Sequence, residues 1–181
     1  MSPVPPDEPA LALAIDFLNT YDALETPPDR LSVDVMHRVA GRHGYPVTFA
    51  AADVERLRAL RERLRPVFAA ADVDTKLAAL NGVLEHATAR VGRVGDRIRL
   101  SATGGGDAVS RFGILVADAL GNAMAAGGPA RFGTCLADPC RCVYVDRTRS
   151  GRQRYCCELC NDRVAAANYR SRRANATTPG K

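Results

Sequence analysis

The sequence predicts a mainly α-helical fold with one short β-strand or hairpin, followed by a small cysteine-rich module at the C-terminus. Two observations lead to this prediction. Apolar residues recur every three to four positions through most of residues 10–126, which is the spacing of amphipathic helices. All six cysteines lie between Cys135 and Cys160, and a basic segment follows them. We therefore expect a helical domain over residues 1–129, a compact module over 130–175 and a disordered tail over 176–181.

Three helices are expected in the first half of the helical domain. Apolar positions at helical spacing define them over residues 10–24, 31–42 and 48–67. Pro27 and Pro28 end the first, because proline cannot continue a helix. Ser32 is suited to cap the second. Pro66 should kink or stop the third, since it removes a backbone hydrogen bond.

The second half of the helical domain should contain two more helices and a strand. The helices are expected over residues 73–90 and 109–126. Between them, residues 96–102 alternate between apolar and polar side chains, with Ile98 and Leu100 on one side, which is typical of a strand. Gly127, Gly128 and Pro129 should end the last helix and mark the domain boundary.

The charge of the chain is concentrated at its C-terminal end. The net charge of +5 is the sum of −2 over residues 1–130 and +7 over residues 131–181. A basic module on a slightly acidic body favours a polyanion as the partner of that module. The sequence has no apolar run of the length that a membrane span needs, and residues 1–9 lack the features of a secretory signal. We therefore expect a cytoplasmic protein without a membrane partner.

The spacing of the cysteines predicts one zinc ion with a structural role. Cys135 and Cys140 form a C-x4-C knuckle, and Cys156 and Cys160 form a C-x3-C knuckle. In a reducing compartment, clustered cysteines are more often metal ligands than disulfides, and zinc favours four such donors. A hairpin of residues 143–147 and 152–155 would bring the two knuckles together. The module would then be ribbon-like or treble-clef-like, a β-hairpin followed by a basic helix.

Six cysteines for four ligand positions leave two to be explained. Cys157 would give a C-x2-C knuckle with Cys160, so the spacing alone does not choose between Cys156 and Cys157. The two cysteines outside the ligand set, Cys142 and Cys157 if Cys156 binds, would be small apolar fillers or redox-responsive thiols. No acid–base pair is grouped with the cysteines, so we expect a structural zinc site and assign no catalytic residue.

From the cysteines onward, the sequence resembles the bacterial CGNR zinc fingers. The shared features are the first knuckle, a hydrophobic strand that ends in Asp146, an arginine-rich turn, an aromatic residue before Cys156, and a last cysteine that leads into a basic helix. This resemblance favours Cys156 over Cys157 as the ligand. The chain departs from the family at two places. Cys160-Asn161-Asp162-Arg163 stands where the family has Cys-Gly-Asn-Arg, and Tyr155 replaces the usual tryptophan.

The N-terminal half is similar to the ABATE domain, which accompanies this finger in a family described as stress-induced transcription regulators. Its signature is matched by Asp16-Phe17-Leu18-Asn19-Thr20, and Leu80-Asn81 also fits. The resemblance implies a zinc-dependent DNA-binding regulator of transcription, with a helical domain that binds an effector, a partner or a second copy in a homodimer.

The basic segment supplies the residues expected to contact DNA. Residues 163–173 have high helix propensity, and Arg163, Arg170 and Arg173 fall roughly on one side of that helix. Such arginines suit phosphate contact and guanine readout. The full expected set adds arginines of the turn and of the helix end: Arg147, Arg149, Arg152 and Arg172. Alternatively, Arg154 and Arg163 would neutralise the zinc–thiolate centre or pair with carboxylates of the body.

Three polar residues on apolar helical faces are candidates for an effector pocket: Asp16, Asn19 and Asn81. Such residues line ligand pockets between helices, but more often they form satisfied buried hydrogen bonds. Two other functions stay open at the level of sequence. One is a zinc-stabilised module that binds an acidic protein, and the other is an enzyme or small-molecule-binding protein with its pocket in the helical domain.

Overall fold

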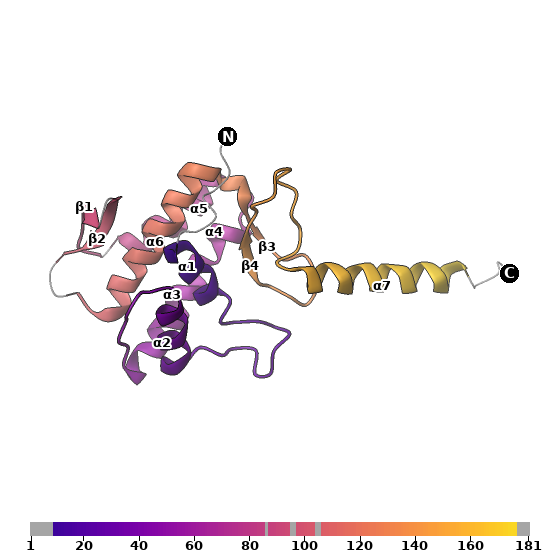
Figure 1. Ribbon diagram of the computed structural model, residues 1–181, viewed down its shortest axis with the longest axis horizontal. Helices are drawn as coiled ribbons and strands as arrows, with labels where there is room; N and C mark the ends of the chain where they lie inside the picture. Colours follow the sequence, from indigo (N-terminus) through magenta and orange to yellow (C-terminus); the bar gives the residue numbers. More distant parts are fainter. Residues whose placement is uncertain (1–8, 86, 95–96, 104–105, 177–181) are drawn as a thin grey trace.

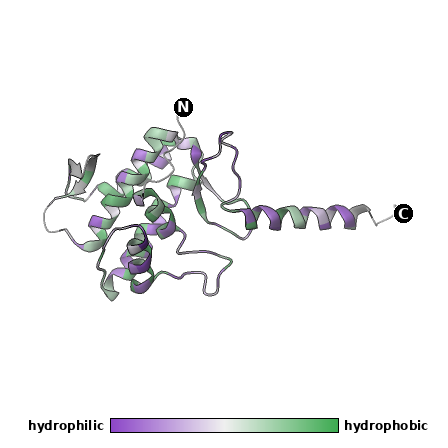
Figure 2. Cartoon of the chain, in the orientation of Figure 1, coloured by the Kyte–Doolittle hydropathy of each residue, from purple (hydrophilic) through white to green (hydrophobic). Residues whose placement is uncertain are grey.

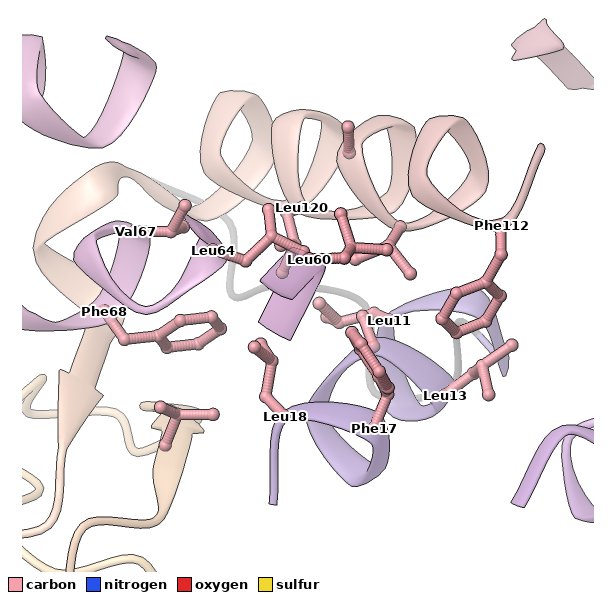
Figure 3. Close-up of a cluster of buried hydrophobic side chains, with 14 of the residues drawn as sticks. Leu11, Leu13, Phe17, Leu18, Leu60, Leu64, Val67, Phe68, Phe112 and Leu120 are labelled. Carbon is pink, nitrogen blue, oxygen red and sulfur yellow. The ribbon is translucent and has the colours of Figure 1, made fainter. Parts of the chain in front are cut away.

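Helices α1 and α6 form the centre of the helical body, and the other body helices pack around them (Figure 1). The computed structural model describes residues 9–85, 87–94, 97–103 and 106–176. Helix α1 spans Pro9–Leu18 and α6 spans Ala108–Gly127. The ring of Phe17 in α1 meets that of Phe112 in α6 edge to face, with ring centroids 5.0 Å apart (Figure 3). The helices of the body confirm the mainly α-helical fold that the apolar spacing predicts.

Four further helices and a short 3-10 turn complete the helical body around α1 and α6. They are α2 (Val33–Arg42), η1 (Ala51–Asp53), α3 (Val54–Leu64), α4 (Pro66–Ala69) and α5 (Val73–Leu84). Ser32 caps α2, because its hydroxyl accepts a hydrogen bond from the backbone N–H of Val35 at 3.2 Å. Pro66 divides the expected third helix into α3 and α4 and occupies the first position of α4, where proline is tolerated.

Two of the expected helices are shorter than their apolar patterns suggest. Helix α1 ends at Leu18 rather than near residue 24, because the buried Thr20 turns back and donates to the carbonyl of Phe17 at 2.7 Å. Tyr21 then pairs with Asp29 in an isolated β-bridge. Helix α5 ends at Leu84 rather than at residue 90. Residues 89–94 instead form a strand that pairs with residues 97–102, and this pairing overrides the helical periodicity at the end of the segment.

The strand predicted over residues 96–102 belongs to a two-stranded antiparallel hairpin. Strand β1 spans Ala89–Val94 and strand β2 spans Arg97–Ala102. Ala89 pairs with Ala102 and Val91 with Leu100. The backbone N–H of Leu100 also donates to the carboxylate of Asp118 in α6, at 3.0 Å, which attaches the hairpin to the body.

The C-terminal module (residues 130–175) contains a second hairpin and a long helix. Its elements are η2 (Pro129–Arg131), β3 (Phe132–Thr134), β4 (Val143–Val145) and α7 (Glu158–Ala176). Strand β4 pairs with β3 and not with residues 152–155, which corrects the expected pairing. The first knuckle is therefore the connection between the two strands. Gly133 is required there, because a Cβ atom would lie 2.7 Å from the ring of Tyr144.

The hydrophobic core of the helical body continues into this hairpin. Phe132, Val143 and Val145 are buried in the same cluster as the body residues, and the ring of Phe132 lies 5.2 Å from that of Phe68. The buried ammonium of Lys76 donates to the carbonyl of Val67 at 2.8 Å and reaches that of Phe132 at 3.5 Å. The hairpin is thus held by the body, although the sequence changes character after Pro129.

Helix α7 extends away from the rest of the molecule (Figure 1). Colouring by hydropathy shows hydrophobic residues gathered on the body helices, whereas α7 is largely hydrophilic (Figure 2). Among the described residues, none of the helices combines the length and the apolar character that crossing a membrane requires.

Candidate functional site

Four cysteine sulfurs converge at the base of α7. Cys135, Cys140, Cys156 and Cys160 place their Sγ atoms within 4.8 Å of one another, and three of the four residues are buried. The Sγ atom of Cys156 lies 3.8 Å from those of Cys140 and Cys160. These are the four cysteines that the spacing and the resemblance predicted as ligands.

Local backbone structure explains how the two knuckles reach this geometry. In the first knuckle, the N–H of Cys140 donates to the carbonyl of Ala137 at 2.8 Å, and the N–H of Cys142 points at the Cys140 sulfur at 3.5 Å. The second knuckle uses the start of α7, where Cys160 lies within the first helical turn and Cys156 just precedes the helix. This short approach to the helix places the sulfurs of Cys156 and Cys160 3.8 Å apart.

The electrostatics of the four thiols call for a cation. Burial raises the pKa of Cys156 strongly, and the charge of Cys140 adds to this. Burial also raises the pKa of Cys160, to about 12. At Cys135 burial opposes the thiolate, but N–H groups of Cys156 and Ala137 lower its pKa. Four thiolates cannot share this space without a compensating positive charge. Zinc supplies that charge, and it prefers four such donors in a tetrahedral arrangement. The residues present therefore fit one structural zinc ion.

The other two cysteines lie beside this group. Cys157 is exposed, with its sulfur 3.8 Å from that of Cys156. Cys142 is buried, and burial together with the neighbouring Cys140 and Asp22 raises its pKa, so it stays a neutral thiol beside the Asp22 carboxylate. The described four-sulfur group contains Cys156 and not Cys157. This placement agrees with the choice that the resemblance favoured.

Arg163 binds the backbone of the first knuckle. Its guanidinium donates to the carbonyl of Ala137 at 2.7 Å and to that of Asp138 at 3.3 Å, and it reaches the sulfur of Cys160 at 4.0 Å. A cation in this position balances the negative charge of a zinc–thiolate centre. Arg163 was expected either among the DNA contacts or as a neutralising charge at the zinc–thiolate centre, and its hydrogen bonds lie at that centre.

Beyond Val164, helix α7 leaves the module. Every side chain from Ala165 to Ala174 is exposed. Arg170 projects from this stretch, Arg172 donates back to the carbonyl of Asn168 at 3.3 Å, and the Arg173 guanidinium lies 5.9 Å from the centre of the Tyr169 ring. The helix therefore presents arginines and amides on a surface that the described chain does not cover.

The remaining predicted arginines lie in an exposed loop, the basic loop (residues 147–154). The buried carboxylate of Asp146 shapes this loop by accepting hydrogen bonds from the N–H of Thr148 at 2.8 Å and from that of Gln153 at 2.9 Å. Gly151 adopts a positive φ of 66° at its turn. Arg131 closes the loop by donating to the carbonyl of Thr148 at 2.6 Å. The loop thus holds three exposed arginines: Arg147, Arg149 and Arg152.

Sequence reasoning did not identify the roles of Asp146 and Arg131. An aspartate two residues before a threonine is a common signal for a side-chain-capped turn, and it could have indicated Asp146. Nothing local indicates Arg131, because its partners are more than ten residues away.

The three candidate pocket residues are only partly brought together. Asp16 and Asn19 line a cavity of about 320 Å³ with three arginines, whereas Asn81 lies on the exposed side of α5 and is not among the residues around it. The carboxylate of Asp16 is 2.8 Å from the ring of His43. The amide of Asn19 bonds both backbone groups of Val143 in β4. The contacts of Asn19 are those of a satisfied structural hydrogen bond, the more common of the two expected roles.

Comparison with models of protein families covers both parts of the chain. Residues 11–130 match the ABATE family, whose description is "Putative stress-induced transcription regulator". Residues 131–173 match the CGNR zinc finger. A search of curated proteins finds no match. Both resemblances drawn from the sequence are confirmed, in the predicted order. The zinc-finger match and the four adjacent cysteines together give a site for one zinc ion.

Proposed function

Because the chain belongs to the ABATE family and carries a CGNR zinc finger, we propose that it is a zinc-dependent regulator that binds DNA. In this proposal, α7 enters a groove of the duplex, and the basic loop contacts the phosphate backbone beside it. The observation that carries the proposal is the exposure of α7 from Ala165 onward, with Arg170, Arg172 and Arg173 on a helix whose base is fixed at the zinc site.

The dimensions and charge of the module suit a duplex. An α-helix with its side chains is about 10–12 Å wide, close to the width of the major groove of B-DNA. Residues 131–181 carry +7, and a zinc ion with four thiolates would reduce this to +5. This positive charge lies on the module that α7 extends, while residues 1–130 carry −2. The duplex is therefore attracted to the module rather than to the body.

The contacts divide between α7 and the basic loop. Arg170 and Arg173 extend from the free part of the helix, where side chains can reach base edges as well as phosphates. Arg147, Arg149 and Arg152 are held by a loop that hydrogen bonds fix in shape, which favours backbone contact. Arg163 is left out of this set, since its guanidinium already binds carbonyls of the first knuckle.

Binding of a labelled duplex of mixed sequence tests the proposal. The zinc-loaded protein should retain the duplex at about 50 mM salt and lose affinity steeply by about 200 mM, since counterions are released on binding. Removal of zinc should weaken binding, because α7 loses its fixed base. A polyglutamate chain serves as the second ligand. Absence of DNA retention at low salt, with polyglutamate bound, would instead support a module that recognises an acidic protein.

A further inference from the structure

A cavity of about 500 Å³ lies where the helical body meets the C-terminal module. We call it the seam cavity. The body contributes Tyr21, side chains of α3, and Arg65, which directly follows α3. The module contributes Thr134, Arg141 and Val143 from the β3–β4 hairpin and its connection. An occupant would therefore contact both parts of the chain at once.

The carboxylates of the seam cavity are already occupied by arginines. Asp29 accepts from Arg61 at 2.8 and 3.0 Å and also from Arg58 at 2.9 Å. Glu62 is 3.3 Å from Arg61 and 3.1 Å from Arg65. The cavity lining contains these two carboxylates and three guanidinium groups, those of Arg61, Arg65 and Arg141. The wall thus carries an excess of positive charge, and neither carboxylate is left alone to repel an anion.

The deepest of these arginines keeps its charge. The side chain of Arg61 is only 3% exposed, and Thr20 and Asp29 both accept hydrogen bonds from it. The hydrogen bond from Arg61 is the main cause that holds the pKa of Asp29 well below its usual range, so the pair is charged at neutral pH. Arg61 therefore contributes a fixed positive potential behind the cavity.

Two arginines nearer the opening offer hydrogen-bond donors. The Nε of Arg65 donates to Glu62 at 3.3 Å, and its Nη1 donates to the carbonyl of Arg141 at 3.4 Å. Within the described part of the chain, its other N–H groups are left to bind an occupant of the cavity. Arg141 is 58% exposed, and its contact with Asp138 is 3.5 Å long between two exposed groups. Such a surface pair is weak, so an anion can replace it.

The rest of the lining is mostly apolar, with Thr134 as a polar member. Ala69 and Val143 supply aliphatic surface, and the ring of Tyr21 lies beneath Arg61 and Arg65, whose guanidinium carbons are 5.7 and 5.3 Å from its centroid. This combination suits a ligand with one acidic group and a compact apolar part. A fully hydrophilic anion would leave the aliphatic surface without a partner.

We propose that the seam cavity binds a small organic anion, whose carboxylate or phosphate meets Arg65 and Arg141 and whose apolar part packs on Ala69 and Val143. Arg141 directly follows Cys140, so the ligand contacts the residue next to a zinc-binding cysteine. Binding at this site does not depend on whether the protein binds DNA, and it can be measured without a duplex.

The test uses the full-length, zinc-loaded protein with benzoate and phenyl phosphate as probes, and benzyl alcohol as the neutral probe. Backbone amide shifts of Thr134, Arg141 and Val143 should saturate with at least one anion and not with the alcohol. Comparison of the two anions distinguishes a carboxylate from a phosphate site. Arg141→Gln should weaken binding at least about tenfold, and this exposed residue can be changed without disturbing the core. Arg38→Gln, an exposed arginine of α2, is the matched control and should leave the shifts unchanged.

Three results would overturn the proposal: no saturable shift with either anion, equal binding of the alcohol, or equal binding by Arg141→Gln and the unmodified protein. Arg65→Gln provides a second variant, whose folding is checked by its thermal melting. It should weaken the anion as Arg141→Gln does.

Discussion

Asn19 makes a two-hydrogen-bond link between the helical body and the C-terminal module. Its amide donates to the carbonyl of Val143 at 3.0 Å and accepts from the N–H of Val143 at 2.8 Å. A side chain thereby completes the backbone bonding of β4 on the side away from β3. Asn is suited to this because it carries both a donor and an acceptor, and Asp or Leu could not satisfy both backbone groups.

Replacing Asn19 should therefore weaken the attachment of the module. Asn19→Ala leaves both backbone groups of Val143 without a protein partner and should reduce the free energy of unfolding by about 2 kcal/mol. Asn19→Asp keeps only the acceptor and should also be destabilising. Urea denaturation followed by circular dichroism measures the change. If Asn19→Ala unfolds at the same urea concentration as the unmodified protein, the amide does not hold the two parts together.

Asp29 makes the free energy of unfolding dependent on pH in the acid range. Its pKa is lowered in the folded state, chiefly by the hydrogen bond from Arg61. A lowered folded-state pKa stabilises the protein above the unfolded-state value of about 3.9, and the stabilisation is lost as the pH falls toward the folded-state pKa. The free energy of unfolding should thus decline below about pH 4.

Asp29→Asn removes this contribution. At neutral pH it should cost roughly 2–3 kcal/mol, since the buried Arg61 loses its main counter-charge. The variant should also show a shallower decline of stability in acid. Equal slopes for the variant and the unmodified protein between about pH 5 and pH 2 would show that the Asp29–Arg61 pair does not produce the acid dependence.

At the scale of elements, α7 depends on the zinc site for its position. Within the described part of the chain, α7 packs against the rest of the molecule at its first turns, through Cys160, Arg163 and Val164. Most helical stability in proteins comes from tertiary packing, which α7 makes at its first turns. The β3–β4 hairpin, in contrast, is buried in the core of the body. Zinc should therefore be essential for α7 and not for the helices of the body.

Chelation of zinc tests this division. The far-UV circular dichroism should lose the signal of the 19 residues of α7, while the cooperative melting of the body persists. Readdition of zinc should restore the signal. Unfolding of the whole chain on chelation would contradict the account, because it would make the body dependent on the metal.

The elements also show how far the sequence is informative. Apolar spacing located the body helices, and cysteine spacing located the metal site. Both signals can be recognised within short stretches of sequence. The partner of β4 was predicted wrongly, since the hairpin forms around the first knuckle and pairing depends on packing against Phe68 and its neighbours. The bonds of Arg163 to the first knuckle join residues some 25 positions apart, so the sequence indicated a neutralising role for Arg163 only as an alternative to DNA contact.

At the scale of the whole molecule, one structural unit carries two chemically different surfaces. The core passes from α1 and α6 through the hairpin, so the body determines the direction in which the module lies. The zinc site then determines the direction of α7. Negative charge predominates on residues 1–130 and positive charge on residues 131–181. A duplex would therefore be oriented toward α7 before any specific contact forms.

The salt dependence of DNA binding tests the central claim most directly. The measurement compares the unmodified protein with the double variant Arg170→Ala, Arg173→Ala, and with Arg38→Ala, Arg111→Ala as the control of equal charge change on exposed body positions. If α7 contacts the duplex, the first variant should bind more weakly, and the slope of log affinity against log salt should become shallower by about 2. The control should keep the slope of the unmodified protein. Equal slopes for all three proteins would contradict the claim that α7 binds DNA.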